Sequence, residues 1–297
     1  MILVIGGGIT GQLVQHIIPE AEILDWRPRP PSRMTRAFGA NYLWEPLEGI
    51  PCRSFPVVTH VDGKPPTDEA IIRYKKKIGK MHDIENWGMQ FVEHTTGYEI
   101  TQLPEPRIHW DRRVIRIDGA HRSVQVDGPR GKENWSYSHL ISTIPLYALM
   151  DMVVVDFWPA DLLMPALEYK PIFVKVTARP PDAPYPPDTW YVNYLSSEVS
   201  PYRVTDRETE RHYESIVPMS GIPSRRISPG KIYPHAHAAQ VVARLQEWGQ
   251  IQCFGRFARW NPDELVHQTY RDILQWRDTY VPMANSGVVY AQLDARP

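Results

Sequence analysis

The feature that most constrains the fold lies at the start of the sequence, where a short apolar run leads directly into three glycines. Residues 2–5 are uniformly apolar, which is typical of a strand buried on both faces. The glycines at 6–8 predict a tight turn. Apolar residues then recur with helical spacing over 9–18, and residues 21–24 predict a second strand. The chain therefore begins as strand, glycine turn, helix and strand.

The spacing of the glycines predicts a phosphate-binding turn. In the pattern Gly6-x-Gly8-x-x-Gly11, the first glycine permits the turn and the second lets the backbone approach a pyrophosphate. The third glycine, Gly11, allows the helix to pack closely on the strand. The amides of Ile9 and Thr10, at the start of the helix, would then face the phosphates. A bound dinucleotide is the expected ligand.

An acidic residue and an interruption in the pattern indicate which dinucleotide binds. Asp25 follows the second strand, where a carboxylate can accept hydrogen bonds from ribose hydroxyls. A compact NAD domain would continue with alternating strands and helices, but residues 26–65 are rich in Arg, Pro and Gly and lack helical periodicity. Related strands return only near residue 114. This interruption favours FAD, whose domain is commonly split by insertions.

The rest of the chain predicts an α/β fold, in which a Rossmann-like FAD-binding domain carries an inserted, mostly antiparallel β substrate domain. Residues 172–217 contain several strand-like runs separated by Pro or charged turns. Helices are expected at 68–80, after a cap at Thr67 or Asp68, at 237–248, and at 262–276, with Asn261 as its cap. We predict a discontinuous FAD-binding domain of residues 1–45, 105–150 and 235–297, and substrate-binding insertions of residues 46–104 and 151–234.

Bulk properties limit the partners that the protein can have. The formal net charge is −1, so no global field draws the chain to nucleic acid or membrane. No apolar run approaches the roughly 20 residues that span a bilayer, and the first strand leaves no room for a signal peptide. We expect the two cysteines, Cys52 and Cys253, to be buried free thiols that form no metal site. We expect a cytoplasmic protein with no membrane partner.

Four segments resemble the FAD superfamily that includes flavin amine oxidases, protoporphyrinogen oxidase and UDP-galactopyranose mutase. They are VIGGGITG at 4–11, ILDW at 23–26, HLISTIPLYAL at 139–149 and CFGRFARWNPDELV at 253–266. The last segment is most similar to the mutase branch. The resemblance implies the superfamily's fold, its FAD cofactor and its redox chemistry. The acid Asp25 departs from the pattern, because most relatives carry Glu there.

The resemblance also implies which residues hold the cofactor. Arg33 matches a basic residue near the phosphates, and residues 39–42 would pass the isoalloxazine. The main chain of Val114 would touch adenine. Gly255 and Arg256 would lie on the ribityl and pyrimidine side of the flavin, with residues 261–266 offering helix-terminal amides. In full, the residues assigned to FAD are Gly6, Gly8, Ile9, Thr10, Gly11, Asp25, Trp26, Arg33, Arg36, Gly39, Ala40, Asn41, Tyr42, Val114, Gly255, Arg256, Asn261, Leu265 and Val266.

The candidate catalytic residues are three aromatic side chains and one arginine. Tyr42, Trp190 and Tyr194 would form walls that exclude water from an amine substrate. Arg203, among aromatic residues on a predicted strand, would orient a substrate carboxylate or phosphate. We expect these residues to meet at the junction between the cofactor and the inserted sheet.

Four functions fit the sequence. The first is an FAD-dependent oxidoreductase acting on a C–N bond of an amine or amino-acid-type group, and the second is a redox-neutral, mutase-like enzyme acting on a sugar nucleotide. The third is an NAD-dependent dehydrogenase, and the fourth is a non-catalytic dinucleotide sensor. The C-terminal segment also resembles small phage flavoproteins that oxidise a glycine joined to a modified thymine. That resemblance implies a modified nucleobase as substrate and DNA as a partner.

Overall fold

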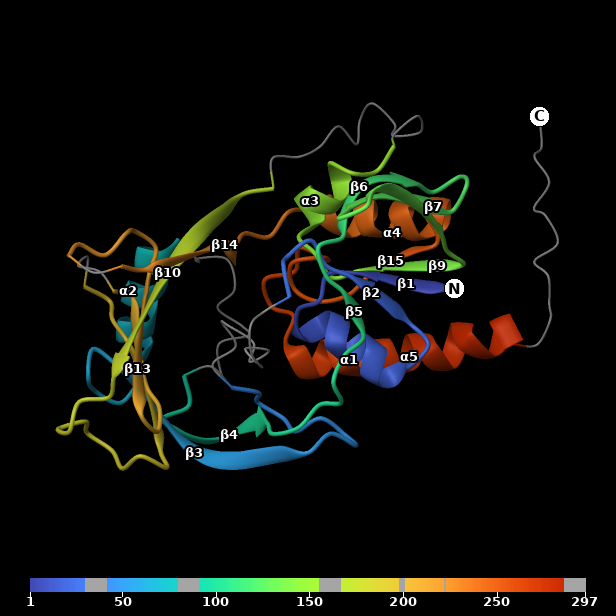
Figure 1. The fold of residues 1–297 in the computed structure, drawn as a ribbon. Helices are drawn as coiled ribbons and strands as arrows, with labels where there is room; N and C mark the ends of the chain where they lie inside the picture. The colour runs from blue at the N-terminus through green and yellow to red at the C-terminus, as the bar shows by residue number, and fades with distance from the viewer. Residues whose placement is uncertain (30–41, 80–90, 155–166, 198–200, 222, 286–297) are drawn as a thin grey trace.

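The protein is built around two large β-sheets and one small one (Figure 1). The computed structural model describes residues 1–29, 42–79, 91–154, 167–197, 201–221 and 223–285. The first sheet has five strands in the order β15-β9-β1-β2-β5, and all its neighbouring pairs are parallel. These strands are β1 (Ile2–Ile5), β2 (Glu22–Leu24), β5 (Ile108–His109), β9 (His139–Ser142) and β15 (Ile251–Cys253).

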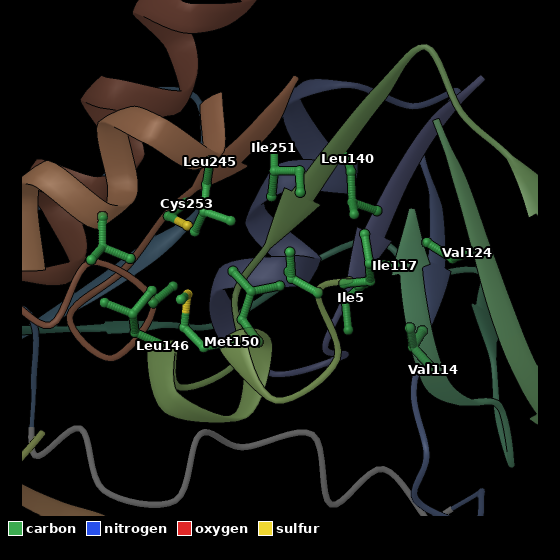
Figure 2. Close-up of a cluster of buried hydrophobic side chains, with 14 of the residues drawn as sticks. Ile5, Val114, Ile117, Val124, Leu140, Leu146, Met150, Leu245, Ile251 and Cys253 are labelled. Atoms are coloured by element: carbon green, nitrogen blue, oxygen red, sulfur yellow. The ribbon is translucent and has the colours of Figure 1, made fainter. Parts of the chain in front are cut away.

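Both faces of the parallel sheet are buried, which explains why β1 is apolar throughout. Leu3 and Ile5 pack in one core cluster with Leu140, whereas Ile2 and Val4 pack in a second cluster on the other face. Figure 2 shows part of the first cluster. The second is covered by α1 (Ile9–Ile17) and α5 (Val266–Asn285). The first is covered by α3 (Leu146–Met150), α4 (Ala238–Gly249) and a small sheet of β6 (Arg113–Asp118), β7 (Ser123–Gly128) and β8 (Gly131–Ser136).

The second large sheet has seven strands in the order β14-β10-β13-β12-β11-β3-β4. All its neighbouring pairs are antiparallel except β11 and β3. Helix α2 (Asp68–Ile78) packs on it through Tyr74, and Thr67 caps this helix by accepting a hydrogen bond from the Ala70 amide. The strands are β3 (Cys52–Val61), β4 (His94–Ile100), β10 (Tyr169–Ala178), β11 (Trp190–Tyr194), β12 (Arg203–Asp206), β13 (Glu210–Ser215) and β14 (Arg225–Ile232).

The predicted fold class is confirmed: one sheet is parallel with helices on both faces, and the other is mostly antiparallel. One strand was not predicted from the sequence, because residues 52–61, within the stretch without helical periodicity, form the long strand β3. Phe55, Val57 and Val61 of this strand all pack in the core of the second sheet. The strands of the parallel sheet come from three separate stretches of the chain, whereas the predicted domain boundaries stay predictions.

Two properties of the described residues concern membranes and metals. None of their helices is both long enough and apolar enough to cross a bilayer. No group of three or more His, Cys, Asp or Glu side chains within these residues is arranged to hold a metal ion. The two cysteines are free thiols, with Cys253 buried and Cys52 partly buried.

Candidate functional site

The glycine turn between β1 and α1 is closely packed at two positions and open at the third. Gly6 has a positive φ of 107°, a conformation that L side chains rarely adopt. A β-carbon at Gly11 would lie only 2.0 Å from the carbonyl oxygen of Gly6, so only glycine lets the helix approach this closely. Gly8 is exposed, and a β-carbon there would meet nothing within 4 Å. The turn therefore leaves open space at Gly8 alone.

The open space adjoins the N-terminus of α1. Gly8 is the N-cap residue and has no side chain to bond the first amides of the helix, and the first turn contains no acidic residue. The positive end of the helix dipole thus lies beside the open space at Gly8, and no acidic side chain of the first turn neutralises it. Such a helix end is suited to a phosphate, which can accept hydrogen bonds from the amides of Ile9 and Thr10.

Asp25 brings a buried carboxylate against the same turn. It is 2% exposed, and its Oδ2 accepts a 2.7 Å hydrogen bond from the Gly7 amide. Its Oδ1 accepts hydrogen bonds from the backbone and the Nε of Arg27, each 2.9 Å long. Trp26, between these two residues, is 66% exposed. The acid therefore lies at the glycine turn, while its predicted bond to a ribose stays a prediction.

The C-terminal segment meets the glycine turn at Gly255. Gly255 has a φ of 92°, and a β-carbon there would lie 3.0 Å from Thr10 Oγ1. Its amide donates a 3.1 Å hydrogen bond to Glu264 Oε1, which also accepts a 2.7 Å bond from Thr269 Oγ1. The two segments predicted to bind the cofactor, from opposite ends of the sequence, therefore lie close together.

Sequence reasoning missed Glu264 and Thr143, which hold the two segments in place. Thr143 Oγ1 is 3.0 Å from the carbonyl oxygens of both Ile5 and Gly6. It stands in the segment HLISTIPLYAL, so the resemblance could have identified it. Glu264 is 6% exposed, and its Oε2 has no hydrogen-bond partner among the described residues. No spacing rule predicts a buried carboxylate at this position.

Arg256 connects the C-terminal segment to the second sheet. Its Nε donates a 3.3 Å hydrogen bond to the carbonyl oxygen of Glu264. Burial lowers the pKa of Arg256, Asp263 opposes this shift, and the positive charge of Arg203 lowers the pKa further. Arg203 belongs to β12, so the charges of Gly255-Arg256 and of the second sheet act on each other through Arg256 and Arg203.

The predicted cap of the last helix is wrong. Helix α5 begins at Val266 rather than at Pro262. Asn261 Oδ1 instead accepts a 3.1 Å hydrogen bond from the Asp263 amide, which stabilises a local turn. The amide of Leu265 is bonded by Gln268 Oε1 at 2.8 Å, so a side chain of α5 already occupies one N-terminal donor.

Of the other predicted cofactor residues, Val114 and Tyr42 are described and five are not. Val114 lies in β6, is 3% exposed and packs in the core cluster beside the parallel sheet. Its predicted main-chain contact with adenine stays a prediction. The remaining residues lie outside the described part of the chain and comprise Arg33, Arg36, Gly39, Ala40 and Asn41.

The four predicted catalytic residues lie together on one face of the second sheet. The rings of Tyr42 and Trp190 meet edge-on, with centroids 6.3 Å apart, and Arg203 Cζ lies 5.9 Å from the centroid of Tyr194. Burial raises the pKa of Tyr42, Tyr194 raises it further, and Arg203 opposes the shift. Tyr42 is therefore a neutral phenol at ordinary pH.

Arg203 forms a buried ion pair with Glu214. Its Nε donates a 3.1 Å hydrogen bond to Glu214 Oε1, and its Nη2 bonds the same oxygen. The other carboxylate oxygen accepts a 2.6 Å bond from the Tyr202 hydroxyl. Burial disfavours the charge on Arg203, but Glu214 and the nearby tyrosines hold its pKa well above the ordinary value. Two nitrogens of Arg203, which was predicted to orient the substrate, are thus already bonded to Glu214.

Comparison with known proteins supports the fold alone. No protein-family model matches the sequence, and no curated protein matches it either. Reduced UDP-galactopyranose mutase superposes with a TM-score of 0.64 at 13% identity, covering 95% of each chain. An oxidoreductase from Methanosarcina mazei gives 0.57 at 11% identity, covering 93% of this chain and 99% of that one. A CLA-producing fatty acid isomerase from P. acnes gives 0.55 at 10%, covering 94% and 98%. The chain therefore has the mixed α/β fold of these proteins.

Proposed function

We propose that this protein is an FAD-dependent oxidoreductase that oxidises a C–N bond of an amine or amino-acid-type group. The observation that carries the proposal is the close approach of Gly255 to Thr10, where an added β-carbon would lie 3.0 Å from Thr10 Oγ1. This approach brings the glycine turn, with its open space at Gly8, beside the segment that the sequence resemblance assigns to the flavin. A dinucleotide with a second ring system needs both parts side by side.

The described residues fit such a cofactor. The uncapped amides of Ile9 and Thr10 would bind the pyrophosphate. Asp25, which already reaches the glycine turn, would bind a ribose. Gly255 and Arg256 would lie on the flavin side, where the buried guanidinium supplies positive charge. Bound FAD would supply the chemistry by accepting a hydride from the substrate carbon next to nitrogen.

The residues on the second sheet suit the substrate that this chemistry requires. Tyr42, Trp190 and Tyr194 pack in one buried aromatic cluster, which would exclude water from a substrate bound beside it. An amine reacts in its neutral form, and the positive charge of Arg256 would disfavour a protonated amine nearby. The same charge would attract an anionic group on the substrate, such as the carboxylate of an amino acid.

The absorbance spectrum of the purified protein tests the cofactor, and anaerobic stopped-flow reduction tests the substrate. We expect a flavin spectrum that bleaches when an amine donor is mixed in. Candidate donors are simple amines, glycine, and glycine attached to thymine in a DNA oligonucleotide, which is the substrate implied by the phage flavoprotein resemblance. A spectrum without flavin would contradict the cofactor assignment, and bound flavin that no amine reduces would contradict the proposed reaction.

A second candidate function is a redox-neutral rearrangement of a sugar nucleotide. It is favoured by the match to reduced UDP-galactopyranose mutase, whose TM-score of 0.64 exceeds those of the oxidoreductase and the isomerase. The two functions separate in one experiment. Conversion of a sugar nucleotide by the chemically reduced protein, without reduction of the oxidised protein by any amine, would replace the first proposal with the second.

A further inference from the structure

Among the buried polar atoms near Arg203 that have no hydrogen-bond partner within the described residues, three lie in one row. They are the indole Nε1 of Trp190, the hydroxyl Oγ1 of Thr205 and the guanidinium Nε of Arg207. Each can donate a hydrogen bond, and buried donors in folded proteins normally have partners. A group of such donors at one place therefore indicates a ligand that accepts hydrogen bonds.

The strand register places the three donors on one face of the sheet. In the antiparallel pair of β11 and β12, Tyr194 lies opposite Arg203, and Val192 lies opposite Thr205. Because side chains alternate along a strand, Trp190 shares this face with Tyr194 and with Thr205. The side chain of Arg207 extends the same row, since its Cζ lies 4.5 Å from the ring centroid of Trp190.

Arg207 differs from Arg203 in what neutralises its charge. Arg203 is bonded directly to Glu214 through two nitrogens. Burial lowers the pKa of Arg207, Glu99 raises it, Arg203 lowers it, and Glu210 and Glu214 raise it. Among the described residues, none of these carboxylates is bonded directly to the guanidinium of Arg207.

We propose that Arg207, together with Thr205 and the indole of Trp190, binds the anionic oxygen group of the substrate. In this arrangement Trp190 supports the flat guanidinium by stacking, which leaves its edge to bond oxygen atoms. The ion pair of Arg203 with Glu214 lies beside this group and does not itself bind the substrate anion. This inference rests on the proposed function for the identity of the substrate, but binding of the anion needs no turnover.

Calorimetric titration of the purified full chain tests the site with two probes. N-acetylglycine presents a carboxylate, and inorganic pyrophosphate presents phosphate oxygens. We expect saturable binding that Arg207→Gln weakens at least about 10-fold, because a hydrogen bond to a charged group is lost. Thr205→Val, which keeps the shape but removes the hydroxyl, should weaken binding several-fold. The matched control is Arg226→Gln, at an exposed arginine on β14, and it should bind like the wild type.

The outcomes separate this inference from the proposed function. Tighter binding of N-acetylglycine would support an amino-acid carboxylate as the group, and tighter binding of pyrophosphate would support the diphosphate of a sugar nucleotide. Unchanged affinity in Arg207→Gln, or no binding of either probe by the wild type, would overturn the site. Flavin content is read separately from absorbance. If the thermal midpoint shows that Arg207→Gln does not fold, the affinity of Thr205→Val for the two probes decides the result.

Discussion

Gly11 packs directly beneath the carbonyl oxygen of Gly6, at a distance that no β-carbon could share. The gap between an added β-carbon and that oxygen would be 2.0 Å, and the obstructing atom belongs to the backbone. Neither partner can yield by rotating a side chain. The helix and the strand of the glycine turn are therefore held at a spacing that glycine alone permits.

We accordingly expect Gly11→Ala to destabilise the fold by about 1–3 kcal/mol or more, as in overpacked cores. The measurement is chemical denaturation followed by circular dichroism. The control is Gly8→Ala, where the new methyl group would meet nothing within 4 Å. Equal stability of the two variants would show that the close approach of Gly11 does not constrain the turn.

The same turn yields a prediction about the cofactor. Gly8→Asp should abolish flavin binding, because its side chain would fill the open space and place a negative charge where the pyrophosphate is expected. The free energy of unfolding should change little, since an acidic residue at a helix N-cap is favourable. Flavin content after purification is the measurement. A folded Gly8→Asp protein with normal flavin content would contradict the proposed cofactor site.

The ion pair of Arg203 and Glu214 should be more costly to break than to replace. Arg203→Ala leaves the buried carboxylate of Glu214 unpaired, so we expect a loss of about 3–5 kcal/mol in the free energy of unfolding. The double variant Arg203→Met with Glu214→Met should recover most of that loss. Chemical denaturation of the wild type and of both variants measures these changes. A double variant no more stable than Arg203→Ala would contradict the prediction.

Glu264 offers a separate test of how the C-terminal segment is held. Glu264→Gln keeps an acceptor for the Gly255 amide and the Thr269 hydroxyl, so we expect nearly wild-type stability and flavin content. Glu264→Ala leaves that buried amide unsatisfied, which should cost about 1–3 kcal/mol. Thermal unfolding and flavin release together measure the effect. A larger loss in the Gln variant than in the Ala variant would contradict this role.

Stability should decrease as the pH falls from about 7 to about 5, with a contribution from His139. Burial, Arg122 and the N-terminal amine lower the pKa of His139 in the folded protein. An unfolded histidine has a pKa of about 6.5 and so takes up a proton first, which favours unfolding as the pH falls. His139→Gln should therefore show a shallower loss of stability over this range. Denaturation curves at several pH values provide the measurement, and an unchanged slope would contradict the prediction.

The parallel sheet and the glycine turn were predictable because local patterns specify them. The apolar run at 2–5 and the glycines that follow need no distant partner to be recognised. Strand β3 was missed because its core residues Phe55, Val57 and Val61 are interrupted by Pro56 and by polar residues. Its partner β11 lies more than a hundred residues away, and no local signal reports such a pairing.

The residues of the candidate site could be predicted from the sequence, but the hydrogen bonds and ion pairs between them could not. The aromatic residues and Arg203 could be chosen by residue type from segments with a strand-like pattern, and they lie together in the structure. The ion pair between Glu214 and Arg203 follows only from the cross-strand register, which places the two residues opposite each other. The donors of Thr205 and Arg207 stand out only once their lack of partners is seen. Burial and register, rather than residue type, carry that information.

The strand order of the parallel sheet also bears on when the protein can fold during synthesis. Strand β9 lies between β1 and β15, so the sheet joins residues 2–5 to residues 251–253 through one shared neighbour. The sheet is therefore incomplete during synthesis until β15, at residues 251–253, has been translated. Pairings between such distant segments form slowly, because loop closure must precede the contacts that reward it. The nascent chain consequently carries β9 without its outer neighbour β15 until residues 251–253 have been translated, which leaves one edge of the partial sheet exposed to aggregation and to chaperones.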